Sequence, residues 1–270
     1  MPAGRQPMVA LETRNLSRRF GAVQACQDVN LRLLDGEIVG MVGANGAGKT
    51  TLLNLITGYL QPTSGRIFYM QDDITGLPPR AVSRKGVARS FQIPQLFSTL
   101  TVLENVLIAV AATRREYRDF WRLLTDRGRL DEAREILDLF GLLPLQGQPV
   151  DQLPQGARKL LDIAVAFAQR PKVLLLDEPT SGVSTSDKFP VMDTIIAALK
   201  KRGVTTLFVE HDMEVIARYA QRVLVLHEGR VIFDDVPQRV LDDDTVRRLV
   251  VGKRPKTEAA AGTDLSRGSP

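Results

Sequence analysis

Residues 43–50 have the types and spacing needed to hold a chain of phosphates. They match the pattern G-x-x-x-x-G-K-[ST], between an apolar run at 38–42 and a helix-period sequence at 51–56. Glycines let backbone N–H groups turn toward an anion, and the following helix adds free N–H groups and the positive end of its dipole. This strand–loop–helix arrangement predicts a phosphate-binding loop, or P-loop, for a nucleoside triphosphate.

The whole loop and the residue after it are predicted to bind the nucleotide. The Lys49 side chain is expected to reach the β- and γ-phosphates, and the Thr50 hydroxyl is expected to ligate Mg²⁺. The predicted nucleotide-binding residues are Gly43, Ala44, Asn45, Gly46, Ala47, Gly48, Lys49, Thr50 and Thr51.

Two adjacent carboxylates, Asp177 and Glu178, follow the apolar run 173–176. Ligands of α/β sheets bind at the carboxyl ends of the strands, where this pair is expected. Successive side chains of a strand point in opposite directions, so the two acids cannot perform the same task. We expect Asp177 to hold Mg²⁺ through water and Glu178 to polarise the water that attacks the γ-phosphate.

Two further predicted strands end near side chains that can assist this chemistry. His211 follows the strand predicted over 205–209 and can orient the attacking water or contact the γ-phosphate. Gln92 closes the strand predicted over 86–91, and its amide oxygen can reach Mg²⁺ or the attacking water. The other histidine, His227, precedes a predicted turn and is expected to have no role in the chemistry.

The elements that must position these residues alternate between strands and helices. Antiparallel strands are predicted on both sides of Phe20, and a hairpin is predicted to join 222–226 to 230–233. A capping box at Thr101 and Glu104 starts a helix, another helix spans 130–140, and α/β alternation resumes with helix 159–169. The predicted fold class is α/β, a P-loop NTPase core with a mainly parallel sheet, an N-terminal antiparallel β-subdomain and a helical subdomain.

The same pattern predicts the domain organisation. We expect a flexible N-terminus at 1–8, one ATP-binding domain at 9–252 and a disordered tail at 253–270. The helical subdomain is expected at about 94–156, where strand patterns give way to helical periodicity.

Composition narrows the class of protein. A chain of 270 residues with 44% hydrophobic and 25% charged residues is typical of a folded soluble protein, and no uncharged apolar run is long enough to span a bilayer. The N-terminus lacks the apolar core of a signal peptide, and the lone Cys26 is expected to be a buried, inert thiol. The net charge of +5 is scattered along the sequence, so we expect no nucleic-acid partner. The positive charge gives modest support for a contact with lipid headgroups.

Taken together, residues 9–252 resemble the ATP-binding subunit of ABC transporters, which implies ATP hydrolysis with ATP and Mg²⁺ as cofactors. In this resemblance Phe20 matches the aromatic residue that stacks on adenine, and residues 153–158 occupy the place of the signature motif. It implies Glu178, His211 and Gln92 as catalytic residues. It also implies Thr50, Gln92 and Asp177 as metal ligands.

The signature motif implies a site shared by two subunits. In the family the subunits pair head to tail, and the signature helix of one caps the ATP held by the other, here through Gly156 in trans. This sequence has Pro154 where the family has serine, and Ser184 where the D-loop has aspartate. Proline suits the first turn of a helix but offers neither hydroxyl nor N–H, so we expect the cap to be retained but weakened.

These departures look like the branched-chain amino acid importer group and its urea and amide relatives, as do segments 56–65, 88–92, 96–97 followed by 101–105, and 209–213. The resemblance implies a subunit that powers import of branched-chain amino acids or a related small polar solute. It implies membrane permease subunits and a second, different ATP-binding subunit as partners, with a periplasmic solute-binding protein acting indirectly. The chain is then expected to be peripheral, at the cytoplasmic face of the inner (plasma) membrane.

Two alternatives stay open at this point. Soluble ABC ATPases of DNA repair or translation usually carry two cassettes, coiled-coil inserts or zinc motifs, and none is visible in this sequence. A regulatory nucleotide-binding module would explain Pro154 and Ser184, but the intact Lys49, Glu178 and His211 favour hydrolysis. For the importer, we expect residues 93–97 to present an apolar groove to a permease.

Overall fold

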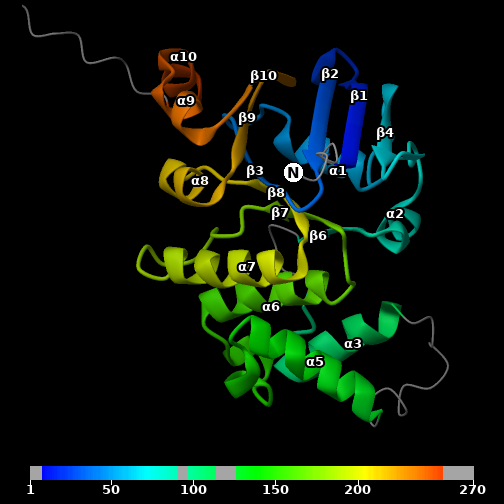
Figure 1. Cartoon of the computed structure of the whole chain (residues 1–270), viewed down its shortest axis with the longest axis vertical. Helices are drawn as coiled ribbons and strands as arrows, with labels where there is room; N and C mark the ends of the chain where they lie inside the picture. Colours follow the sequence, from blue (N-terminus) through cyan, green and yellow to red (C-terminus); the bar gives the residue numbers. More distant parts are fainter. Residues whose placement is uncertain (1–7, 91–95, 114–125, 252–270) are drawn as a thin grey trace, which may run out of the picture.

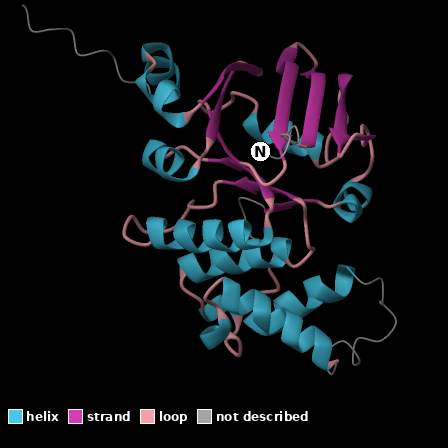
Figure 2. Ribbon diagram, viewed as in Figure 1, coloured by secondary structure: helices cyan, strands magenta, loops and turns pink. Residues whose placement is uncertain are grey.

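The computed structural model describes residues 8–90, 96–113 and 126–251. Two sheets lie at one end of the molecule, and a layer of helices lies at the other (Figures 1 and 2). Gln92 and most of the apolar stretch 93–97 are therefore outside the described residues, as are the predicted tail at 253–270 and residues 1–7 of the predicted flexible N-terminus.

The N-terminal sheet is antiparallel, as predicted. Its strands are β1 (Val9–Phe20), β2 (Val23–Leu34), β4 (Ser64–Tyr69) and β5 (Asp72–Asp73), in the order β2-β1-β4-β5. Phe20 pairs with Val23 across a tight turn in which Gly21 has φ 56°, a conformation that glycine adopts readily.

Most of the residues predicted to bind and hydrolyse the nucleotide lie at or after the ends of strands of the second sheet. Its strand order is β10-β9-β3-β8-β7-β6. Strands β9, β3, β8, β7 and β6 run parallel to one another, and β10 is antiparallel to β9. Glu228 and Gly229 join β9 to β10, both with positive φ (46° and 76°), as a tight hairpin turn requires. The strands are β3 (Ile38–Val42), β6 (Val87–Ser90), β7 (Val173–Asp177), β8 (Thr205–Val209), β9 (Arg222–His227) and β10 (Arg230–Asp235).

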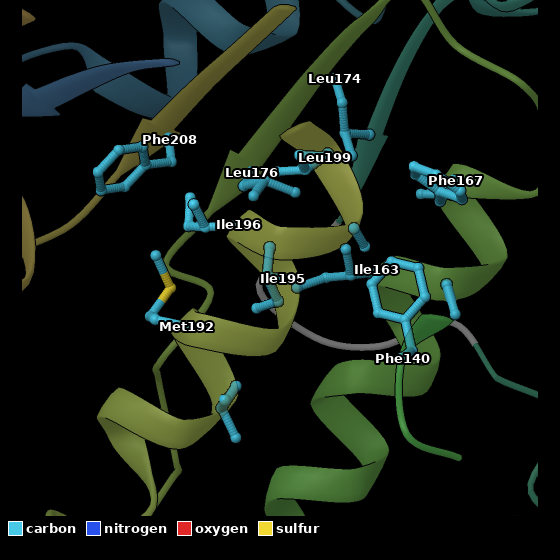
Figure 3. Close-up of a cluster of buried hydrophobic side chains, with 14 of the residues drawn as sticks. Phe140, Ile163, Phe167, Leu174, Leu176, Met192, Ile195, Ile196, Leu199 and Phe208 are labelled. Atoms are coloured by element: carbon cyan, nitrogen blue, oxygen red, sulfur yellow. The ribbon is translucent and has the colours of Figure 1, made fainter. Parts of the chain in front are cut away.

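Both faces of this sheet are buried, which explains why most positions of its central strands are apolar. Along β7, Val173 and Leu175 belong to the core shared with α1 (Lys49–Ile56) and the antiparallel sheet. Leu174 and Leu176 belong to the opposite core. Figure 3 shows this second core, where Leu174 and Leu176 face helix α7 (Lys188–Arg202).

The helical region supports the second core. The capping box is confirmed, since the Thr101 hydroxyl accepts the Glu104 N–H at 3.2 Å and the Glu104 carboxylate accepts the Thr101 N–H at 2.7 Å. The predicted helix 130–140 begins earlier, because the Asp126 carboxylate caps the N–H of Arg129 at 3.0 Å. The elements of this region are α3 (Val102–Thr113), α5 (Arg127–Leu139) and two short 3₁₀ segments, η1 (Leu143–Leu145) and η2 (Val150–Gln152).

Helix α6 (Gln155–Phe167) also begins earlier than the predicted 159–169. Pro154 is its N-cap, with φ −58° and ψ 154°, and a missing N–H removes no hydrogen bond at that place. The remaining elements are α2 (Pro79–Lys85), α8 (Met213–Tyr219), α9 (Pro237–Asp242), α10 (Asp244–Val246) and a π-helical turn, η3 (Arg247–Val251). In the described part of the chain, no helix has the length and apolar character needed to span a bilayer.

Candidate functional site

Three of the predicted groups meet at one edge of the six-stranded sheet. The P-loop leaves β3, Asp177 and Glu178 end β7, and His211 follows β8. Because β8 lies between β3 and β7 and all three strands are parallel, their carboxyl ends lie side by side. The strand order therefore brings together residues that are far apart in the sequence.

The shape of the P-loop depends on glycine at two positions. A Cβ on Gly43 would lie 2.3 Å from the carbonyl oxygen of Leu226. Gly48 has φ 103°, and a Cβ there would lie 2.3 Å from the carbonyl oxygen of Ala25. The loop is thus packed against β9 and β2, and α1 begins directly after it with its first N–H groups directed at the predicted phosphate site. Asn45 and Gly46 are exposed at the tip of the loop.

Lys49 is buried at the centre of this arrangement. Its ammonium donates hydrogen bonds to the carbonyl oxygens of Gly43 at 2.6 Å and Ala44 at 3.0 Å, so the side chain folds back over the loop. Burial lowers the pKa of Lys49, and the nearby carboxylates of Glu178 and Asp177 oppose that shift. The structure therefore places a cation between the loop and the acid pair.

Asp177 and Glu178 have different partners, although only Asp177 belongs to β7. The buried Asp177 carboxylate accepts a hydrogen bond from the Arg89 guanidinium at 2.6 Å. Glu178 leaves the strand with a left-handed backbone, φ 50°, and its N–H donates to the carbonyl oxygen of Val209 at 3.0 Å. Its half-buried side chain lies next to β8 instead.

His211 is the partner of Glu178. The His211 Nε2 and Glu178 Oε1 atoms are 2.8 Å apart, within hydrogen-bond distance. The histidine is exposed and the glutamate is half-buried, so the pair is accessible to solvent. A carboxylate oriented by an imidazole is a suitable acceptor for a proton from water.

Glu210 is a polar residue of this site that sequence reasoning did not assign. It is buried, and its carboxylate accepts the N–H of Thr180 at 2.8 Å and the hydroxyl of Thr180 at 2.7 Å. Burial raises the pKa of Glu210, while these hydrogen bonds oppose the shift. It ties the segment after Glu178 to the end of β8, next to His211. An acid directly after a buried strand was the signal for it.

Lys159 was also missed. It lies on the buried side of α6 and is 3% exposed, and no hydrogen-bond acceptor for its ammonium lies among the described residues. Burial lowers the pKa of Lys159, and the surrounding carboxylates oppose the shift. These carboxylates belong to Asp162, Glu210, Asp177 and Glu178. Lys159 lies four residues before Ile163, on the apolar stripe of the helix, but that position alone does not indicate which element covers it.

The ring of Phe20 remains accessible at the end of β1. Its exposed fraction is 42%, and the Arg18 guanidinium lies 4.5 Å from the ring centre. Arg18 also donates a hydrogen bond to the carbonyl oxygen of Gln61 at 2.8 Å, which holds the cation beside the ring. The geometry therefore presents an exposed aromatic ring supported by a cation.

The start of α6 is exposed at Pro154 and Gln155, and Gly156 is half-buried. A Cβ on Gly156 would meet nothing closer than Val191 at 3.4 Å, so the fold of this chain does not require glycine there. The hydroxyl of Ser184 donates to the carboxylate of Asp187 at 2.7 Å and accepts the Asp187 N–H at 3.2 Å. The serine at the D-loop position thus makes local bonds before α7.

Cys26 and His227 are expected to have no role in the chemistry. Cys26 is buried, and burial raises the pKa of its thiol to about 12. The His227 ring lies 3.9 Å from the exposed carboxylate of Glu228 at the β9–β10 turn.

Comparison with known proteins agrees with these features. A family described as "ABC transporter" matches residues 26–181, more than half of the chain. The high-affinity branched-chain amino acid transport ATP-binding protein BraF of Pseudomonas aeruginosa is 33% identical over 251 residues, covering 90% of this chain and 98% of that protein. The protein named LivG, with the same description, from Escherichia coli K12 is 34% identical over 255 residues, covering 92% and 99%.

Two of the solved structures that resemble this chain are also ATP-binding cassettes of ABC transporters. The ADP conformation of the ABC transporter cassette MJ1267 has a TM-score of 0.80 and 29% identity, covering 91% of this chain and all of that one. A dimeric post-hydrolysis state of the cassette MJ0796, bound to ADP and Pi, has a TM-score of 0.72 and 25% identity, covering 84% and 98%.

Proposed function

Because the chain belongs to the ABC transporter family of ATPases, we propose that it powers import of branched-chain amino acids or a related small polar solute. The observation that carries the proposal is the meeting of Lys49, Glu178 and His211 at one sheet edge, in a chain similar over nine-tenths of its length to BraF. Uptake of labelled leucine by cells that lack this chain tests the substrate. Loss of uptake, restored by the intact gene, is expected; normal leucine uptake contradicts branched-chain amino acids as the solute and leaves the related polar solute to be tested in the same way.

In this proposal, the nucleotide binds between the P-loop and the exposed ring of Phe20. The P-loop residues 43–50 and Thr51 surround the phosphates with N–H groups, and Lys49 moves from its loop carbonyls to the β- and γ-phosphates. Phe20 stacks on the adenine with the ring that β1 leaves exposed.

Mg²⁺ fits the oxygen donors at this edge. The Thr50 hydroxyl is exposed in the first turn of α1, and the Asp177 carboxylate uses Oδ2 for Arg89, which leaves Oδ1 outside that ion pair. Thr50 and Asp177 would hold the ion, with Gln92 as the third proposed ligand. When bound, the ion neutralises charge on the phosphates. Gln92 is assigned from its place after β6 alone.

The hydrolytic step belongs to Glu178. Its carboxylate accepts a proton from the water that attacks the γ-phosphate, and the 2.8 Å contact with His211 holds it in place. Lys49 stabilises the charge that develops on the phosphoryl oxygens. Gln92 orients the same water in this proposal.

A single P-loop leaves the γ-phosphate exposed, so the site is completed by a second ATP-binding subunit. Gly156 supports this arrangement because its own fold does not require glycine there, while the missing side chain would allow a partner's nucleotide to approach the backbone closely. A related cassette is described as dimeric. We propose a heterodimer beneath two permeases at the cytoplasmic face of the inner membrane, fed by a periplasmic solute-binding protein.

Pro154→Ser is expected to raise the ATPase rate of the assembled transporter about tenfold. The serine hydroxyl adds one charge-assisted hydrogen bond to the partner's ATP, worth about 1.5–3 kcal/mol. The start of α6 already tolerates a residue with φ −58° and an extended ψ, as an N-cap serine adopts. Phosphate release measures the rate, and an unchanged or lower rate contradicts the weakened cap.

The contact with a permease is proposed for Leu96 and Phe97. Phe97 is 55% exposed. The Asn105 side chain accepts the backbone N–H of Phe97 at 2.9 Å and donates to the backbone carbonyl oxygen of Phe97 at 3.1 Å. Leu96 packs partly against the core beneath it. An apolar ring held on a fixed backbone is a suitable contact for an apolar coupling helix.

Leu96→Asp with Phe97→Asp is expected to abolish recruitment to permease-containing membranes, with nucleotide affinity unchanged. Phe97→Asp alone spares the core and is expected to remove most of the recruitment. Co-sedimentation with membranes measures it. Val236→Asp, at another exposed apolar residue, is the control and should leave recruitment normal. Normal recruitment of the double variant refutes this surface.

A further inference from the structure

Arg89 is a buried cation beside the proposed metal site. Its side chain is 5% exposed, and that of its partner Asp177 is 4% exposed. One arm of the guanidinium, Nη2, donates to Asp177 Oδ2 at 2.6 Å. The other arm, Nη1, donates to Asn54 Oδ1 at 2.5 Å. Arg89 therefore joins β7 to α1 through two short hydrogen bonds.

The strand register explains why these groups meet. Arg89 is paired with Leu175 in the parallel ladder between β6 and β7. Asp177 lies two residues beyond Leu175, so all three side chains share one face of the sheet. Leu175 packs in the core shared with α1, so this is the face that α1 covers. An arginine in β6 is thus directed at both the helix and the carboxylate.

Asn54 lies on α1 close to Thr50, one of the residues proposed to hold Mg²⁺. It lies four residues after Thr50, on the same side of α1 and one turn further along the helix. The helix thus connects the Asn54 end of the bridge to the Thr50 hydroxyl, and β7 supplies Asp177 at the other end. Thr50 and Asp177 are the described ligands proposed for Mg²⁺, and Arg89 binds the elements that carry them.

We propose that Arg89 is a positioning residue that sets the separation of the two metal ligands Thr50 and Asp177. The inference rests on the proposed function, because it takes Mg²⁺ to bind between these residues. A planar guanidinium with donors on two arms can hold an amide and a carboxylate at fixed places, whereas the single ammonium of lysine cannot do so with the same geometry. Since the ion pair is shielded from water, its orientation is not lost to solvent competition.

The test measures the metal requirement separately from nucleotide binding. In one titration, ADP is added to the full-length chain in EDTA, which gives the metal-free ADP affinity. In a separate, EDTA-free titration, Mn²⁺ is added in the presence of ADP, and bound Mn²⁺ is followed by electron paramagnetic resonance. Arg89→Lys is expected to weaken Mn²⁺ binding about tenfold, the lower end of effects seen when a residue orienting a metal ligand is changed. Asn54→Ala keeps the ion pair between Arg89 and Asp177, so it is expected to weaken Mn²⁺ binding less than Arg89→Lys does. ADP affinity in EDTA should stay unchanged in both variants.

Two controls complete the design. Arg66→Lys changes an exposed ion pair with Asp73 in the antiparallel sheet and should leave Mn²⁺ binding unchanged. Asp177→Asn removes the proposed ligand itself and should weaken Mn²⁺ binding in any case. If Asp177→Asn has no effect, the proposed metal site is wrong, which is a different failure from that of the inference.

Given an effect of Asp177→Asn, the Arg89 variants decide the inference. Unchanged or stronger Mn²⁺ binding in Arg89→Lys overturns it, and so does an equal loss of ADP affinity in EDTA, since that shows a general disturbance of the nucleotide site. Should Arg89→Lys not fold, Asn54→Ala carries the same decision. Weaker Mn²⁺ binding with normal ADP affinity supports the positioning role.

Discussion

Glu178→Gln is expected to lower ATP hydrolysis by about 10²–10⁴-fold while ATP remains bound. The amide cannot accept the proton of the attacking water, but it has nearly the same size as the carboxylate. Its oxygen or nitrogen can keep the 2.8 Å contact with His211, and the backbone hydrogen bond to Val209 does not involve the side chain. The chemical step is therefore lost without loss of the site's shape.

The measurement needs two readouts from the same preparation. Phosphate release gives the rate, and labelled ATP retained after rapid gel filtration gives the bound nucleotide. Glu228→Gln is a matched control, since it makes the same substitution at an exposed glutamate in the β9–β10 turn. Unaltered hydrolysis by Glu178→Gln shows that another group is the base. Loss of hydrolysis with loss of ATP binding shows that Glu178 maintains the pocket instead.

Lys49→Met is expected to weaken ATP binding about 100-fold and to abolish hydrolysis. The ammonium is the buried cation at the centre of the loop, and two charge-assisted hydrogen bonds to phosphate are each worth about 1.5–3 kcal/mol. Methionine preserves the length of the side chain and its apolar stem. It also removes an ammonium whose burial lowers the Lys49 pKa, so the free protein should remain folded.

Fluorescent nucleotide titration measures the affinity, and thermal unfolding without nucleotide checks the fold. Lys85→Met is the control, because Lys85 is exposed and paired with Asp72 on the surface. Equal nucleotide affinity for Lys49→Met and the unaltered chain contradicts the phosphate contact. Stabilisation of the unaltered chain by ATP, but not of the variant, is the expected thermal result.

The residues that sequence alone located are those whose role follows from local backbone geometry. Gly43 and Gly48 stand where a Cβ would overlap a carbonyl oxygen, so glycine at this spacing was a reliable signal. The Thr101–Glu104 capping box is a bond between neighbours in sequence and was confirmed. Alternation along the strand also predicted that Asp177 and Glu178 would perform different tasks; the structure gives them different partners, Arg89 and His211.

Helix ends were less predictable, because they depend on what surrounds them. Periodicity placed the start of α6 at Lys159, whereas the helix begins at Gln155 after Pro154. Lys159 was therefore predicted as the first residue of the helix, yet it is the fifth, and its side chain is buried near the carboxylates at the sheet edge. A single charged residue on an apolar stripe carries no signal of the element that will cover it.

The sequence by itself determined the P-loop, the apolar strands and the acidic and imidazole groups that end them, because each depends on residues a few positions apart. Only the tertiary structure decided which of these groups touch. The order β3-β8-β7-β6 brings His211 to Glu178 and Arg89 to Asp177, and the placement of α1 on one face adds Asn54. Strand order and helix placement arise from burial of apolar faces shared by the whole chain, so no local pattern encodes those contacts.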